Sequence, residues 1–187
     1  MDLTRSLVVT SAREYRDAHP LYPVEQEAIE TLPAAFASGE YGRRDAAWVV
    51  RWHYRRFLGE YPDEQRRAAE ARFWDTEFDA VRAAIADAVR ATKSNDAAEA
   101  MDRLTELKGV DVPVAAAFCM FIDPDEFVAV GPREWTALRT ADELDRPYPD
   151  PPSRSAYETY LERCRSVAER VDCDCWPLYR ALWRLGG

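Results

Sequence analysis

The stretch that decides the fold is Leu104-Thr-Glu-Leu-Lys-Gly-Val-Asp-Val-Pro-Val-Ala-Ala-Ala117. Apolar residues three or four positions apart lie on both sides of Gly109, and this spacing indicates two helices joined by a tight turn. Glycine suits the left-handed backbone that such a turn needs, and Asp111 is a good N-cap for the second helix. The sequence therefore predicts a helical hairpin at about residues 97–122. Its buried residues are expected to be Leu104, Leu107, Val110, Ala116, Phe118 and Ile122.

The rest of the chain is also helical in pattern. Only seven of the 187 residues are glycine, and long runs of alternating β-branched residues are absent, so the fold class is expected to be all-α. Further helices are expected at about residues 27–37, 44–58, 64–74, 78–89, 157–171 and 177–185. Pro33 should kink or break the first of them, Asp75 or Thr76 should cap the fourth, and Ser153 or Ser155 the fifth. The whole chain, 1–187, is expected to be one helical unit or two small lobes, and only residues 147–152 have the composition of a linker.

The composition is acidic. The net charge is −9, which argues against a surface that binds polyanions non-specifically. Lysine occurs only at positions 93 and 108, and an acidic, lysine-poor chain is typical of a halophile or of a GC-rich genome. High salt screens phosphate attraction for every protein, so in that setting the charge argues less strongly against DNA binding. With no signal peptide and no long apolar segment, a soluble cytoplasmic protein without a membrane partner is expected.

The cysteines and histidines do not indicate a metal site. Cys119 lies in an apolar run and Cys164 on an apolar helix face, while Cys173 and Cys175 follow at a spacing that matches no common metal motif. The only histidines, His19 and His53, are far apart in sequence. No metal and no cofactor are therefore expected.

A second segment gives the hairpin a family resemblance. Val130-Gly-Pro-Arg-Glu-Trp135 follows the hairpin, and its Gly131 comes eighteen positions after Pro113. Together the hairpin and this segment resemble the core of the helix-hairpin-helix DNA glycosylase superfamily, which includes endonuclease III and oxoguanine DNA glycosylase. The resemblance covers residues 97 to about 138. It implies a DNA-glycosylase-like helical fold and a hairpin whose turn amides hold a DNA phosphate.

The same resemblance predicts that the usual chemistry is missing. The family's lysine nucleophile would fall at Pro113 and its aspartate at Gly131, and neither residue can do that work. The turn itself is Gly109-Val110-Asp111, where the family has Gly-apolar-Gly. Lys108, Gly109, Val110 and Asp111 are the expected DNA contacts. Asp123, Asp125 and Glu134 are candidate catalytic carboxylates, each more simply explained as a helix cap or a solvated carboxylate.

A basic and aromatic segment, Trp48-Val-Val-Arg-Trp-His-Tyr-Arg-Arg-Phe57, is the other unusual feature. Arg51 and Arg55 share one helix face and could contact phosphates, while Trp52 or Tyr54 stacks on a base. The simpler interpretation is a buried aromatic helix whose arginines pair with nearby carboxylates.

The sequence favours one function and leaves two alternatives. The favoured function is binding of DNA, or recognition of damaged DNA, without standard glycosylase chemistry. The first alternative is an active glycosylase that uses a displaced carboxylate, and the second is a non-catalytic domain that binds a protein or a small molecule. Nothing in the sequence identifies a protein partner.

Overall fold

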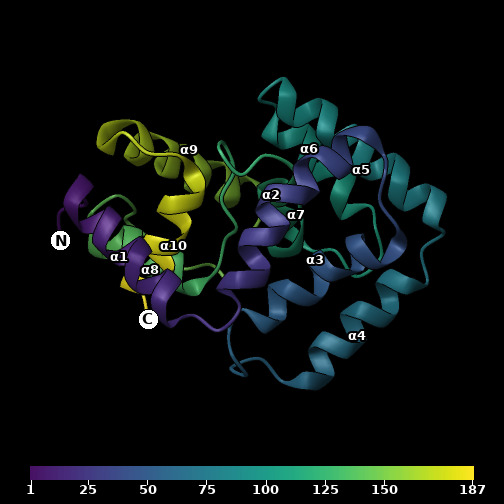
Figure 1. Cartoon of the computed structure of the whole chain (residues 1–187), viewed down its shortest axis with the longest axis horizontal. Coiled ribbons are helices and arrows are strands. Elements are labelled where there is room, and N and C mark those ends of the chain that lie inside the picture. Colours follow the sequence, from purple (N-terminus) through teal and green to yellow (C-terminus); the bar gives the residue numbers. More distant parts are fainter.

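The computed structural model describes all 187 residues. It contains ten α-helices and no β-strand, so the all-α prediction is confirmed (Figure 1). The helices are α1 (Arg5–Ala18), α2 (Tyr22–Ser38), α3 (Arg43–Arg55), α4 (Asp63–Trp74), α5 (Phe78–Lys93), α6 (Ala97–Thr105), α7 (Val112–Ile122), α8 (Pro132–Thr140), α9 (Arg154–Val171) and α10 (Cys175–Leu185). None of them combines the length and the apolar composition needed to cross a membrane.

The predicted hairpin is present as α6, a turn at residues 106–111, and α7. All six residues expected to be buried around it are buried. Helix α7 is the most enclosed helix, since every residue from Pro113 to Ile122 is buried. The hairpin is therefore part of the core, and its turn lies at the N-terminal end of the buried helix α7.

The helices form two groups around one core. In Figure 1, α1, α8, α9 and α10 lie on one side together with both termini, and α2 to α7 lie on the other. Within the first group α10 packs against α1 and α8, and within the second α7 packs against α2, α3 and α6. Buried apolar side chains from both groups belong to a single cluster, so the groups share their interior.

Two local expectations were wrong. Pro33 was expected to kink or break its helix, and the break is absent, because α2 continues to Ser38. Leu32 and Phe36 on either side of Pro33 are buried, and their packing holds this turn helical although proline donates no hydrogen bond. The N-cap of α5 is Glu77 and not Asp75 or Thr76, because Asp75 instead ends α4. Ser153 does cap α9, accepting a hydrogen bond from the amide of Ala156 at 3.2 Å.

Residues 147–152, which have linker composition, do not separate two bodies. They belong to the connection between α8 and α9, and Pro152 is buried. The indole nitrogen of Trp135 donates to the carbonyl of Arg146 at 2.8 Å, and the rings of Trp135 and Tyr148 lie 5.8 Å apart, edge to face. This segment is thus held against the body of the protein, where it forms walls of two cavities.

Candidate functional site: a pocket beside the helical hairpin

The turn of the hairpin requires glycine at position 109. Its φ angle is +78°, and a Cβ atom there would lie 2.4 Å from the carbonyl oxygen of Ala69 in α4. Val110, the next residue, is buried. One side of the turn is therefore packed against α4, while the side chain of Lys108 is exposed and donates to the carbonyl of Asp75 at 3.4 Å.

Asp111 caps α7, as its residue type suggests. One of its carboxylate oxygens accepts a hydrogen bond from the amide of Val114 at 3.1 Å. Asp111 as a whole residue is exposed, but desolvation of its carboxylate by the surrounding protein raises its pKa in spite of this bond. The carboxylate thus already holds an amide of the helix end that would face a phosphate, and it places a negative charge there.

Gly131, where the sequence resemblance would place an aspartate, has no room for a side chain. It is the N-cap of α8, in extended backbone, and Pro132 begins the helix as the sequence indicates. A Cβ atom at Gly131 would lie 2.6 Å from Nη2 of Arg56, 2.8 Å from Oε2 of Glu134 and 3.1 Å from Cζ of Phe57. An arginine–glutamate pair therefore fills the space that a carboxylate would need.

This pair is fully buried. Arg56 and Glu134 are both 0% exposed and form a salt bridge. Arg56 also donates to the carbonyl of Val130 at 2.9 Å and to the hydroxyl of Tyr179 at 3.2 Å. Burial alone would lower the pKa of Arg56, but the charge of Glu134 offsets it and the pKa is raised. Glu134, a weak catalytic candidate in the sequence, is thus the buried partner of an arginine.

The other two catalytic candidates lie at the opposite end of α7. Asp123 is its C-cap, and the carbonyl of Asp125 accepts a hydrogen bond from the amide of Cys175 at 3.0 Å. An 11-residue helix is about 16 Å long. Asp123 and Asp125 are therefore distant from Asp111 and Pro113, and neither lines the pocket described next.

A cavity of about 340 Å³ opens beside the hairpin, and we call it the hairpin pocket. Its walls come from α3, α4, the start of α7 and the 148–152 segment. Asp111 and Pro113 contribute from the hairpin, so the end of the turn and the start of α7 both face this cavity. The aromatic side chains in its lining are Tyr54, Tyr61 and Tyr148.

His53 of α3 also lines the hairpin pocket. It is 3% exposed, and its Nδ1 atom has no hydrogen-bond partner. Burial, together with the charge of Arg56, lowers the pKa of His53 well below its usual value. His53 is therefore a neutral imidazole with unused hydrogen-bonding capacity at the wall of a cavity.

Three charged side chains line the same cavity: Asp111, Asp150 and Arg72. None of them belongs to an ion pair of the protein, in contrast to Arg51, Arg66 and Arg67 nearby. With His53 neutral, these groups give the lining one net negative charge. The tyrosines do not add to it at neutral pH, since burial raises the pKa of Tyr54 to about 12 and also raises those of Tyr61 and Tyr148.

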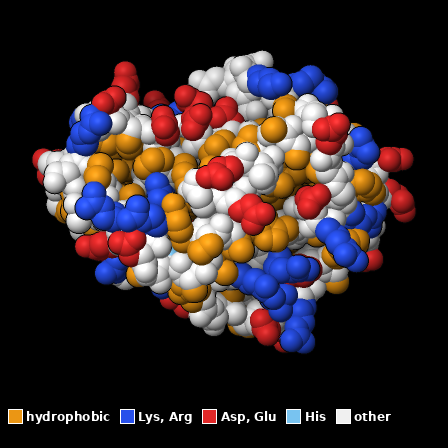
Figure 2. Space-filling model, in the orientation of Figure 1, with side chains coloured by type: hydrophobic (Ala, Val, Ile, Leu, Met, Phe, Trp, Pro, Cys, Tyr) orange, Lys and Arg blue, Asp and Glu red, His pale blue; other side chains and the backbone are white.

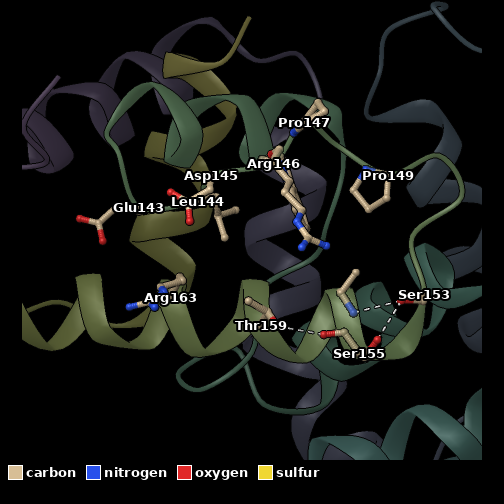
Figure 3. Close-up of a pocket in the computed structure, with 12 residues that line it drawn as sticks. Glu143, Leu144, Asp145, Arg146, Pro147, Pro149, Ser153, Ser155, Thr159 and Arg163 are labelled. Carbon is tan, nitrogen blue, oxygen red and sulfur yellow. Dashed lines mark hydrogen bonds between the residues drawn. The ribbon is translucent and has the colours of Figure 1, made fainter.

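A second cavity, of about 480 Å³, lies between the 143–149 segment and α9 (Figure 3). Figure 3 shows Arg146 extending into it from the loop, opposite Ser155 and Thr159 of α9. Ser153 and Ser155 are already bonded to each other at 3.1 Å, and Thr159 donates to the carbonyl of Ser155. The lining mixes two acidic and two basic side chains, and no residue predicted from the sequence as a site residue belongs to it.

The basic and aromatic segment is mostly internal or paired. Trp52 is buried and donates from its indole nitrogen to Glu25 at 2.8 Å, so it cannot stack on an outside base. Arg51 pairs with Glu70 at 3.1 Å, as the simpler interpretation expects, and Arg55 is exposed without an ion pair. Figure 2 shows the face of the molecule seen in Figure 1. Basic side chains on it, including those over α4, lie among carboxylates.

One buried cluster was not indicated by the sequence. Glu25 of α2 is 0% exposed and accepts from the hydroxyl of Tyr15 at 2.8 Å as well as from Trp52. Its Oε1 lies 3.8 Å from Nδ1 of His19. Burial raises the pKa of Glu25 to about 7 and lowers that of His19 to about 4. Side chains from α1, α2 and α3 meet around this carboxylate only in the folded chain, so no local pattern marks this cluster.

All four cysteines are free thiols, and no group of three or more histidine, cysteine or acidic side chains is arranged to hold a metal ion. Comparison with models of known families, with curated proteins and with solved structures finds no match to this chain.

Proposed function

We propose that this protein is a non-catalytic binding domain related to the helix-hairpin-helix DNA glycosylases, and that its hairpin pocket binds a small organic molecule. The proposal rests on a contrast between Gly131 and Pro113, the two positions where the resemblance places the family's catalytic residues. Gly131 faces a closed, buried ion pair, whereas Pro113 faces an open cavity of about 340 Å³. A space of this size falls within the range of small-molecule sites.

The lining of the cavity supports a ligand more than it supports a reaction. It offers a neutral histidine without a partner, three tyrosines and unpaired charges, and these are groups that orient a bound molecule. It contains no lysine, cysteine or serine, so the amine, thiol and serine nucleophiles of covalent catalysis have no representative there.

The two histidines allow a direct test of binding at this place. His53 lines the hairpin pocket, while His19 is buried against Glu25 and Arg56. We expect NMR titration of histidine-labelled protein with a library of small aromatic and polar molecules to shift the His53 ring signals and leave those of His19 unchanged. A library that moves neither signal, or both together, would contradict ligand binding in the hairpin pocket.

The absence of chemistry is tested separately. Incubation with duplexes carrying an abasic site or a damaged base should give no covalent adduct on borohydride reduction and no released base. A trapped adduct, or base release that Asp123→Asn or Asp125→Asn abolishes in a folded protein, would instead support a displaced catalytic group.

DNA binding by the hairpin is the second candidate, and the backbone of the turn favours it. Gly109 has the positive φ of such turns, and Lys108 is exposed beside it. The carboxylate of Asp111 opposes a phosphate at this turn. Asp111→Gly should therefore tighten binding to duplex DNA, by about 1–2 kcal/mol, with a gain that shrinks as salt increases. Equal affinity of a folded Asp111→Gly variant and the wild type would argue against DNA contact through this turn.

A further inference from the structure

The charges and rings of the hairpin pocket define the kind of molecule that fits it. We infer that the pocket binds a small organic cation with a single charge and N–H donors, such as an alkylammonium or aralkylammonium ion. This inference rests on the proposed ligand-binding function and narrows it to one chemical class.

The charge of the lining is the first argument. Asp111 and Asp150 face one cavity without an ion pair, and Arg72 compensates only one of them. Their proximity is reflected in the pKa of Asp111, which burial raises and the charge of Asp150 raises further, while Arg72 opposes the shift. A ligand with one positive charge would neutralise the remaining negative charge, whereas an anion would face two carboxylates across a small cavity.

The aromatic walls are the second argument. Tyr54 and Tyr61 pack edge to face, with ring centroids 5.7 Å apart, and Tyr148 completes the aromatic part of the lining. Aromatic ring faces attract cations, and groups of aromatic rings with a carboxylate are the usual recognition elements for organic ammonium ions. Burial raises the pKa values of all three tyrosines, so they are uncharged at neutral pH. The charge of the lining therefore comes from its carboxylates and its arginine alone.

His53 provides the third argument, and it is independent of the acidic side chains. His53 is 3% exposed and lines the cavity, and burial together with the charge of Arg56 lowers its pKa well below the usual value. The ring is therefore uncharged at neutral pH. A protonated histidine here would repel an organic cation, whereas the neutral ring of His53 does not.

The test uses three molecules of nearly the same shape: benzylammonium, benzyl alcohol and benzoate. Binding to the full chain is measured by calorimetry at pH 7 and low salt, with melting temperatures recorded for every variant. We expect benzylammonium to bind about threefold to tenfold more tightly than benzyl alcohol, and benzoate to bind least, because the charged side chains of the lining are exposed and one charge–charge contact there is worth about 1 kcal/mol. Added salt should weaken benzylammonium binding only.

Matched variants assign the effect to the pocket. Asp111→Asn keeps a good N-cap, and Asp150 is exposed, so both asparagine variants should fold. Each should weaken benzylammonium binding by about threefold to tenfold, and Arg72→Gln should strengthen it by a similar factor. Asp142→Asn is the control, since Asp142 is exposed, lies outside the pocket and has a positive φ that asparagine adopts readily.

The outcomes separate this inference from the proposed function. If benzyl alcohol or benzoate binds as tightly as benzylammonium and shifts His53, the pocket binds ligands but the cation inference is overturned. If benzylammonium binding is unchanged in Asp111→Asn, Asp150→Asn and Arg72→Gln, the charges do not select the ligand and the inference is again overturned. If no molecule of the series or of the NMR library binds, the inference and the proposed function both fail.

Discussion

Adding one methyl group at Gly131 tests whether the space beside this residue is closed by the pair of Arg56 and Glu134. In Gly131→Ala the new Cβ would lie 2.6 Å from Nη2 of Arg56 and 2.8 Å from Oε2 of Glu134, well inside ordinary contact distance. Both atoms end long side chains, but Arg56 is held by Val130 and Tyr179 as well as by Glu134, so they cannot easily move away. Crowding a packed interior in this way costs about 1–3 kcal/mol.

Gly42→Ala is a matched control for this change. Gly42 is also an N-cap in extended backbone, and its added Cβ would meet only Asp45, at 3.6 Å. The loss of a glycine N-cap is therefore common to both variants, and their difference isolates the crowding. In a chain of this size, 1 kcal/mol corresponds to about 2–4 °C, so Gly131→Ala should melt about 2–12 °C below Gly42→Ala.

The measurement is urea and thermal unfolding followed by far-UV circular dichroism at one salt concentration. Gly131→Asp should lose more stability than Gly131→Ala because it places a second carboxylate beside Glu134, and we expect it to show no base release. Equal stability of Gly131→Ala and Gly42→Ala would refute the reasoning, since the ion pair would then yield and the position would be open.

Three further predictions concern buried or capping carboxylates. Glu134→Gln leaves the Arg56 guanidinium buried without its counter-charge, so the free energy of unfolding in urea should fall by about 3–5 kcal/mol. Asp123→Asn is the control and should have a small effect. A fall below about 1 kcal/mol for Glu134→Gln would show that water or another group replaces Glu134. Burial raises the pKa of Glu25 from 4.5 to about 7, so the folded state keeps a proton between these values that the unfolded state has released. Stability of the wild type relative to Glu25→Gln should therefore fall, by about 3 kcal/mol, as pH rises from 4.5 to 7, and a flat difference over this range would contradict the shift. Asp111→Ala should lose about 1 kcal/mol through the missing N-cap of α7 while Asp111→Asn loses little, and equal stability of the two would mean that the bond to Val114 contributes nothing.

Much of the fold could be predicted because it depends on local pattern. The hairpin is specified within about ten residues of sequence, by the apolar spacing of Leu104 and Leu107 and by the turn at Gly109. The start of α8 is specified by Pro132 after Gly131. Helix α1 was not indicated, although its buried residues Val8, Ala12 and Tyr15 have helical spacing, because polar residues such as Ser11 share its inner face. Where packing overrides local preference, as at Pro33, the sequence misleads.

The candidate site could be predicted only in part. The hairpin side of the pocket, Asp111 and Pro113, follows from the motif, but His53 and Asp150 come from segments whose approach depends on the whole fold. The same holds for Arg56 and Glu134, which are 78 positions apart: each is an ordinary surface-type residue until the structure pairs them. Charged residues usually lie outside, so a buried pair of this kind leaves no signal in composition or periodicity.

The packing of α1 and α2 against α10 has a consequence for the order of folding. Tyr15 contacts Tyr179 and Trp183, and Gln26 bonds to Trp176, 150 positions away. Forming contacts this distant in sequence costs a large loop-closure entropy. We therefore expect the local helical units around α5, α6 and α7 to form first, and the contact of α1 and α2 with α10, which we call the seam, to form last. Because Glu25 lies under Tyr15 at the seam, water should reach it whenever the seam opens, and amide exchange in α1 and α10 should be faster than in α7.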